Sequence, residues 1–412
     1  MHLLCAAKLK FMSKLLQAAG AMSAATLISR VLGLVREQVF AVLFGAGNAM
    51  DAFVVAYKIP NLFRDLFAEG AMNAALVPTF IRTREKEGQA RAWRIAGLVF
   101  RVLVLGLGLF VLVGIFFAPQ IVEFIAPGFK DTAGKFELTV SLTRMIFPYL
   151  VMVSLAAALM GILNASGVYF LPALASALFN FTSIVSGVAF SFIVPQWGWQ
   201  PIEGMALGIL VGGLVQATCQ LPRLYKEGYR FQKQKAEEPT WHQEPALRSM
   251  LGLMGPVLIS SAAVQINVVV NNILATTQGP GSVSWLNYAF RLFQFPIGVF
   301  GVSLAAAALP AISRHWVNQD YAQAKGTIES SLRNTFAITL PSFVGLAVIA
   351  QPLIELIFQY GKFSAQDSYN TSLALMGYAG GICAYSMVKI MVPACYAMGS
   401  ARIPVISSVI SV

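Results

Sequence analysis

The sequence predicts an all-α polytopic membrane protein. Of its 412 residues, 57% are hydrophobic and only 11% are charged, whereas soluble domains carry about 25% charged residues. Apolar runs of roughly 20 residues, the length of a membrane-crossing helix, recur along the whole chain. These two observations together favour a bundle of helices that crosses a bilayer many times.

The expected helices follow one another through the entire chain. Each is an apolar run long enough to cross the hydrocarbon layer, and several carry proline, which neighbouring helices tolerate in membranes. We place them at 15–44, 50–81, 93–118, 138–164, 170–195, 203–222, 246–277, 283–313, 328–351 and 367–397, and an eleventh begins near 402.

Basic residues gather in every second loop. The N-terminus and the loops after the second, sixth and eighth helices are rich in Lys and Arg, whereas the opposite loops contain only Lys130, Lys135 and Lys362. Cytoplasmic loops show this enrichment, so the bias predicts a cytoplasmic N-terminus. It also accounts for most of the net charge of +11, and we therefore expect no nucleic-acid partner.

Two lobes are predicted from an internal repeat. The segment AMNAALVPTFIR (71–82) resembles AAAALPAISR (305–314), and IVEFI (121–125) resembles LIELI (353–357). Both matches have the same offset, which aligns Pro78 with Pro310 and Glu123 with Glu355. Such repeats are common in transporters, where the substrate path lies between the halves. The predicted parts are an N-terminal extension (1–14), a first six-helix lobe (15–222), a cytoplasmic linker (223–245) and a second lobe (246–412).

Charged residues inside the predicted helices are the main functional signal. Charges at membrane depth are expensive and usually functional. On the second helix, Asp51, Lys58, Asp65 and Glu69 share one face, and the acids there can neutralise nearby cations. The cations remain in excess, and guanidinium groups suit phosphate. The basic residues are Arg30, Arg36, Lys58, Arg64, Arg144, Arg291 and Lys389, of which Arg144 and Lys389 fit a structural or a functional role equally well.

Enzyme chemistry has no signature in the sequence. The patterns GxxxxGK[ST], GxSxG and HExxH are absent, and the four cysteines and three histidines are scattered. We therefore expect no enzyme activity and no cofactor, and the residues assign no metal site.

Four segments resemble the MurJ/MviN family, the bacterial lipid II flippases of the multidrug/oligosaccharidyl-lipid/polysaccharide exporter superfamily. They are SRVLGLVRE (29–37), FGAGNAMDAFVVAYKIPNLFRDLFAEGAMNAALVP (44–78), GSVSWLNYAFRLFQFPIGVFGVSLAAAALP (281–310) and FQYGKF (358–363). The resemblance implies two lobes around a central cationic cavity in the bacterial inner membrane. It also implies movement of lipid II, an undecaprenyl-pyrophosphate-linked disaccharide-pentapeptide, from the inner to the outer leaflet by alternating access, for peptidoglycan synthesis.

The resemblance also implies a set of site residues. Acids that some members carry beside the arginine of the eighth helix are Phe290 and Gln294 here, so their role does not carry over. The implied substrate-binding residues are Arg30, Arg36, Arg64, Arg291, Ser29, Asn61 and Ser284, and the implied gating or charge-pairing residues are Asp51, Glu69, Lys58 and Asp65.

Several further expectations come with the family. Its members have fourteen helices, so we expect a C-terminally truncated chain with an incomplete second lobe. We expect a monomer in contact with membrane lipids, coupled to a cation gradient or to the membrane potential. The alternatives are a flippase for another polyprenyl-linked glycan, a small-molecule exporter, and a truncated, non-transporting membrane scaffold.

Overall fold

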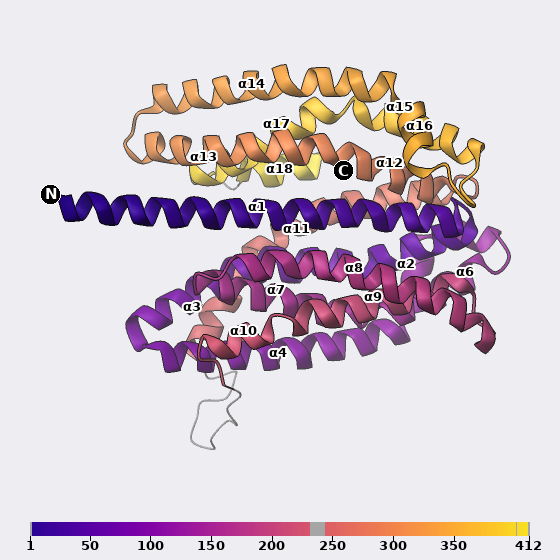
Figure 1. Ribbon diagram of the computed structural model, residues 1–412, viewed down its shortest axis with the longest axis horizontal. Helices are drawn as coiled ribbons and strands as arrows, with labels where there is room; N and C mark the ends of the chain where they lie inside the picture. Colours follow the sequence, from indigo (N-terminus) through magenta and orange to yellow (C-terminus); the bar gives the residue numbers. More distant parts are fainter. Residues whose placement is uncertain (1, 231–243, 401, 411–412) are drawn as a thin grey trace. The chain divides into compact units, whose positions relative to one another are not determined.

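Helices make up nearly all of the structure, a computed structural model that describes residues 2–230, 244–400 and 402–410 (Figure 1). Some side chains within these ranges, including that of Glu69, lie outside the described set. The chain divides into two compact units. The first contains residues 1–36 and 55–265, and the second contains residues 37–54 and 266–412.

The helices α1 (His2–Phe44), α2 (Asn48–Arg64) and α11 (Pro245–Thr276) each contribute residues to both units. The first unit continues with π-helix η1 (Asp65–Met72), α3 (Asn73–Glu87), α4 (Gln89–Phe116), α5 (Ala118–Ile125), η2 (Pro127–Asp131), α6 (Lys135–Ile146), α7 (Tyr149–Ala165), α8 (Phe170–Ile193), η3 (Val194–Trp197), α9 (Pro201–Thr218) and α10 (Leu221–Lys226). The second continues with α12 (Ser282–Pro296), π-helix η4 (Ile297–Gly301), α13 (Val302–Val317), α14 (Tyr321–Val348), α15 (Ala350–Phe358), α16 (Ala365–Ala379), α17 (Ile382–Ala397) and α18 (Arg402–Ile410).

A helix occupies each predicted apolar stretch, but most of the stretches are interrupted, some of them near one end. The stretches 50–81 and 283–313 each contain a π-helix, 138–164 breaks between α6 and α7 just before Tyr149, and 367–397 breaks at Gly380–Gly381. The short helices α5 and α15 lie in segments predicted as loops. Both helices are apolar on one side, but they are too short for their sequences to be recognised as membrane-crossing helices.

Five helices or joined helix pairs are long and apolar enough to cross a membrane, and the number rises to seven if each bent pair counts as one span. This result rests on length and composition and concerns the described residues only. It agrees with a multi-pass membrane protein.

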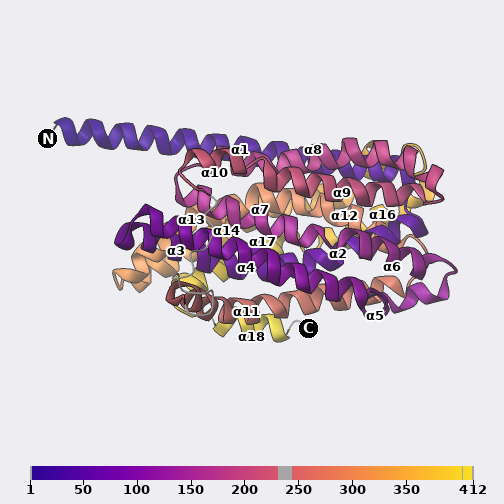
Figure 2. The ribbon, with the colours of Figure 1, turned by 90° about the horizontal axis from the view of Figure 1, so that it is seen from below.

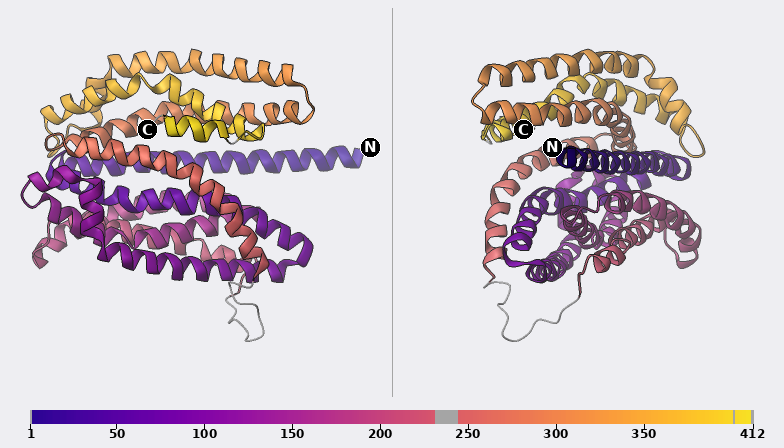
Figure 3. Two further views of the ribbon diagram at one scale, coloured as in Figure 1. Left: turned by 180° about the vertical axis from the view of Figure 1, so that it is seen from behind. Right: turned by 60° about the vertical axis from the view of Figure 1, so that its left-hand side comes forward.

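The offset of the sequence repeat recurs in the boundaries of the helices. The helix α4 begins at Gln89 and α14 at Tyr321, and the π-helices begin at Asp65 and Ile297. Each of these pairs is separated by the same offset as Pro78 and Pro310. Packing repeats as well, because α3, α4 and α7 contact one another in the first unit as α13, α14 and α17 do in the second. Figure 3 shows α13 and α14 in orange beside α17 in yellow. The six-helix composition of the predicted lobes stays a prediction.

The predicted linker 223–245 is described only at its ends, since residues 231–243 lie outside the described residues. Tyr229 packs against Trp93 and Phe100 of α4, and burial raises the pKa of its phenol. At the other end, Arg91 pairs with the buried carboxylate of Glu244 at 2.6 Å. Both described ends therefore contact the first turns of α4.

Glycines allow α8 and α9 to pack backbone to backbone in the first unit (Figure 2). Gly204, Gly208 and Gly212 recur at every fourth position on α9 and face α8. A Cβ at Gly208 would lie 2.5 Å from Cα of Gly187. Small residues at this spacing let membrane helices approach closely, because lipid supplies no hydrophobic force between them.

We expect Gly208→Val to lower the melting temperature of the purified protein, since overpacking of a close interface costs about 1–3 kcal/mol. The control is Gly106→Val, because Gly106 is exposed and has open space at its Cβ position. The melting temperature of both variants is measured in detergent, from the amount of protein that still elutes as a single peak in size-exclusion chromatography after heating. Equal melting temperatures for the two variants would contradict the packing argument.

Candidate functional site

The carboxylate of Asp51 caps a helix far away in the sequence. It accepts hydrogen bonds from the backbone N–H groups of Gly281 (2.7 Å) and Ser284 (2.9 Å) and from Oγ of Ser284 (2.6 Å). The first N–H groups of a helix lack partners within it, and a negative charge is stabilised there. Asp51 is 1% exposed. Its buried carboxylate gains hydrogen-bond donors from the start of α12, and the N–H groups there gain an acceptor.

Glycine is required at the capped end of α12. Gly281 has φ 93°, in the left-handed region, and a Cβ there would collide with the carbonyl oxygen of Ala46. The backbone of α12 can therefore approach the chain that leads into α2.

A second carboxylate, Glu37 of α1, meets α12 two turns further along. Its Oε1 lies 3.3 Å from Nε of Arg291, and its Oε2 accepts a hydrogen bond of 3.2 Å from the amide of Asn287. Ser284, Asn287 and Arg291 are spaced by three and four residues and so lie on one face of α12. This face therefore carries the contacts to residues 37–54, all inside the second unit.

Arg291 retains donors for a ligand. Its side chain is 39% exposed, and Glu37 engages Nε, one of the three nitrogens of the guanidinium. In the part of the chain that the structure describes, its two terminal nitrogens have no hydrogen-bond partner within the protein. A guanidinium held at Nε with its other donors open is oriented for an anion.

In the first unit, aromatic rings hold Arg36. Its guanidinium lies 5.5 Å from the ring centroid of Tyr57 and 5.7 Å from that of Phe179, and the residue is buried. Such contacts stabilise a desolvated cation. Arg30, which lies about one and a half turns before Arg36 on α1, is exposed.

The junction of α2 and η1 carries a pair of adjacent charges. Nε and a terminal nitrogen of Arg64 donate to Oδ1 of Asp65 at 3.0 and 2.8 Å, and both side chains are partly exposed. One turn earlier, the amide of Asn61 donates to the carbonyl of Tyr57, while its buried Oδ1 has no hydrogen-bond partner among the described residues. Lys58 is half-buried.

The remaining predicted residues have other surroundings. The backbone carbonyl and hydroxyl of Ser29 accept hydrogen bonds from the amide of Asn180 on α8, at 3.1 and 3.5 Å. Nζ of Lys389 lies 5.0 Å from the ring centroid of Tyr385. Glu69 lies outside the residues whose side chains are described. Among the described residues, no group of three or more His, Cys, Asp or Glu side chains is placed to hold a metal ion.

The family model described as "Lipid II flippase MurJ" matches residues 40–412. The chain belongs to the MurJ family. A protein of Burkholderia cenocepacia named lipid II flippase MurJ is 34% identical over 384 residues, which are 92% of this chain and 73% of that protein. A probable lipid II flippase MurJ of Buchnera aphidicola subsp. Schizaphis graminum is 34% identical over 94% of this chain and 73% of its own length.

Solved structures agree with the MurJ assignment. A structure titled "Lipid II flippase MurJ, inward closed conformation" is 28% identical, covers 94% of this chain and 78% of its own, and gives a TM-score of 0.78. An inward-facing MATE family transporter gives a TM-score of 0.72 at 14% identity, which shows a shared fold alone.

Sequence reasoning did not single out Glu37 and Asn287, which contact the α12 face that carries Arg291. In the sequence, Glu37 stands out only as the residue that follows Arg36. The available signal was the position of Asn287 between Ser284 and Arg291, one helical turn from each. That spacing predicts a shared face, but it does not predict that Glu37 lies opposite.

We expect Asp51→Ala to speed amide hydrogen exchange at Gly281 and Ser284 by tenfold or more. The unpaired N–H groups cost about 1–3 kcal/mol, and Asp51→Asn should show a smaller effect of the same sign. The matched control is Asp320→Ala, because Asp320 caps α14 through the N–H of Gln323. If exchange at the start of α12 is the same in wild type and Asp51→Ala, the capping role is wrong.

Proposed function

We propose that this chain moves lipid II from the inner to the outer leaflet of the bacterial inner membrane. The observation that carries the proposal is the MurJ family match over residues 40–412, supported by relatives named as lipid II flippases. The activity is transport rather than catalysis. The lysines and arginines in alternate loops support a cytoplasmic N-terminus for this multi-pass protein.

The arginines are the proposed partners of the lipid II pyrophosphate. Arg30 and Arg64 of the first unit and Arg291 of the second have exposed or partly exposed side chains. Arginine forms bidentate, charge-assisted hydrogen bonds with phosphate oxygens, which repay the cost of keeping the cation in an apolar region. Arg291 supports the assignment best, because its terminal nitrogens are open while Nε is anchored.

The remaining site residues take supporting roles in this proposal. Ser29, Asn61 and Ser284 supply polar groups to the headgroup path, and the buried Arg36 acts closer to the outer gate. Asp51 is the proposed latch of that gate, since its three hydrogen bonds hold the start of α12. The other proposed gating or charge-pairing residues are Lys58, Asp65 and Glu69.

Energy for the cycle is proposed to come from a cation gradient or from the membrane potential, and the working unit is proposed to be the monomer. Each elementary charge that crosses 100 mV contributes about 2.3 kcal/mol. The excess of intramembrane cations favours a response to the membrane potential on physical grounds.

Replacement of Arg30, Arg64 or Arg291 by Ala should abolish growth support in bacteria depleted of their own lipid II flippase. Loss of one charge-assisted phosphate contact costs about 1.5–3 kcal/mol, or roughly ten- to a hundredfold in binding. Arg314→Ala is the control, because Arg314 is an exposed arginine of α13 with no assigned role. The unaltered chain must support growth, and immunoblots must show equal membrane levels. Full growth with all three variants would exclude the arginine assignment.

Collapse of the membrane potential should reduce the lipid II exposed on the outer leaflet in cells that depend on this chain. Valinomycin with external potassium dissipates the potential, and cleavage by an added lipid II-degrading toxin reports outer-leaflet lipid II. If exposure is unchanged both by this treatment and by replacement of external sodium, the coupling proposal fails. The arginine assignment is not affected by that result.

A further inference from the structure

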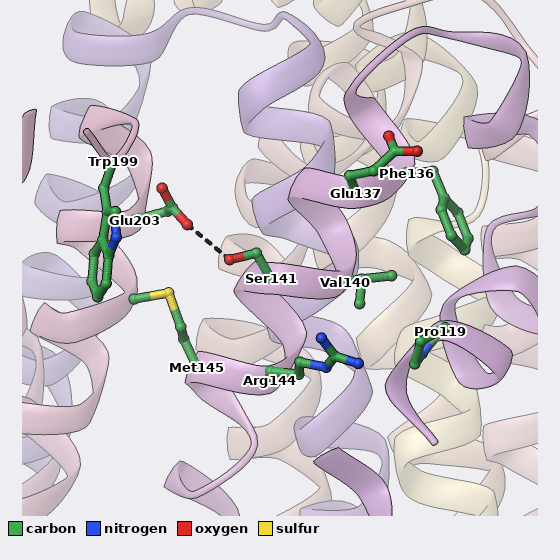
Figure 4. Close-up of a pocket in the computed structure, with 9 residues that line it drawn as sticks. All are labelled: Pro119, Phe136, Glu137, Val140, Ser141, Arg144, Met145, Trp199 and Glu203. Carbon is green, nitrogen blue, oxygen red and sulfur yellow. Dashed lines mark hydrogen bonds between the residues drawn. The ribbon is translucent and has the colours of Figure 1, made fainter. Parts of the chain in front are cut away.

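A pocket of about 470 Å³ lies in the first unit, and none of its lining residues belongs to the proposed lipid II path. It is bounded by α5, by one face of α6, and by the start of α9 with the segment before it (Figure 4). Its volume is within the range of ligand sites in proteins, about 300–1,000 Å³.

Charges are ordered along the α6 wall of this pocket. Glu137, Ser141 and Arg144 are spaced by four and three residues, so they share one helical face. Glu137 lies in the first turn of α6 and Arg144 in the last. Figure 4 shows the carboxylate of Glu137 and the guanidinium of Arg144 toward opposite ends of this face, with Ser141 between them.

Both end charges have unused hydrogen-bonding capacity. Nε of Arg144 donates a long bond of 3.3 Å to the carbonyl of Ile115, which uses one of the five guanidinium N–H groups. Within the described ranges, its other donors and the carboxylate of Glu137 have no protein partner. The second acid of the pocket is different, because Glu203 accepts hydrogen bonds from Oγ of Ser141 and N–H of Gln200, both at 2.8 Å.

The surroundings place this pocket at a lipid headgroup level. On α4, Leu105, Leu109, Leu112 and Phe116 form an apolar stripe that is 64–73% exposed, as expected for a face in contact with lipid. Exposed aromatic rings occur at the pocket and in the segments next to it, and such rings mark the membrane–water interface. They are Phe116, Phe117, Trp197 and Trp199.

Arg144 lies at the level of this interface, because it bonds to Ile115 in the last turn of α4. The helix α6 runs inward from Lys135 to Ile146. From water toward the membrane interior the α6 wall of the pocket therefore presents Glu137 and then Arg144, and the apolar side chain of Met145 lies on the α9 side of the pocket. Figure 4 shows Met145 extending from α6 toward Trp199.

We propose that this pocket binds a zwitterionic phospholipid whose headgroup carries a phosphate and a primary ammonium. Arg144 donates to the phosphate, Glu137 accepts from the ammonium, and the acyl chains extend from the pocket along the exposed stripe of α4. The helical rise separates the Cα atoms of Glu137 and Arg144 by about 10 Å along the axis, a span that fits a phosphate, an ammonium and a hydrogen bond of about 2.8 Å at each end.

Charge decides among the lipids available. An anionic headgroup without an ammonium meets the carboxylates of Glu137 and Glu203 beside its phosphate, and it leaves Glu137 without a partner. A quaternary ammonium offers no N–H donor to that carboxylate. With the N-terminus in the cytoplasm, the bound lipid belongs to the outer leaflet. Binding of a phospholipid at this pocket does not depend on lipid II being the cargo.

The test is native mass spectrometry of the purified full chain, freed of lipid in detergent and titrated with three dioleoyl lipids. These are phosphatidylethanolamine, phosphatidylglycerol and phosphatidylcholine. The wild type should bind phosphatidylethanolamine most tightly. Arg144→Gln should weaken binding of all three by about tenfold, the value of a charge-assisted hydrogen bond. Glu137→Gln should remove the preference for phosphatidylethanolamine and leave the binding of phosphatidylglycerol unchanged or tighter.

Matched controls separate the site from the lipid that coats any membrane protein. Arg314→Gln and Glu329→Gln remove an exposed cation and an exposed anion from the second unit, and both should bind like the wild type. If Arg144→Gln fails to fold, the lipid selectivity of Glu137→Gln tests the proposal. Glu137 is exposed and lies in the first turn of α6, so its replacement should leave the fold intact. Equal wild-type affinity for the three lipids, or an unchanged preference in Glu137→Gln, would overturn the proposal.

Discussion

The buried carboxylate of Asp51 is the interaction on which the organisation of the second unit depends. A bilayer offers no water to an unpaired backbone group or charge, so each needs a partner within the protein. Asp51 and the start of α12 satisfy one another through three hydrogen bonds. This contact explains why residues 37–54 belong with a helix from the second half of the chain, and why Gly281 accepts a left-handed backbone.

The two units share a scaffold but differ in charge. Helix boundaries and packing partners recur at the offset that relates Pro78 to Pro310, so similar apolar patterns build similar frameworks twice. At this offset the equivalent position to Arg64 is Pro296, that to Lys58 is Phe290, and that to Arg291 is Ile59. Repeated packing therefore does not require repeated charge, and most of the intramembrane cations lie in the first half.

Some of the arginines in the apolar helices and at their ends keep open donors. Arg36 is buried between aromatic rings, whereas Arg291 is anchored at one nitrogen and Arg144 by one long hydrogen bond. An arginine with a single protein contact is both oriented and available, the combination that phosphate recognition needs. The same principle links two different proposals, the pyrophosphate of the cargo at Arg291 and the headgroup of a membrane lipid at Arg144.

By itself, the sequence determined the membrane setting, the positions of the apolar helices, the repeat offset and the excess of intramembrane arginines. These properties are local or periodic, since hydropathy adds along a segment and helical spacing sets which residues share a face. The motifs also carried the family resemblance. The interruption of most of these stretches by π-helices or breaks escaped prediction, because packing against neighbouring helices decides where a helix bends.

Only the tertiary structure decided which charge meets which partner. The sequence placed Asp51 among possible counterions for the second helix, but its carboxylate caps α12, and Arg291 lies against Glu37 rather than a residue singled out beforehand. The pocket at Arg144 likewise needs α5, α6 and α9 together. Hydrogen bonds and ion pairs depend on distances of about 3 Å between segments far apart in the chain, and such distances follow from helix packing rather than from any local pattern.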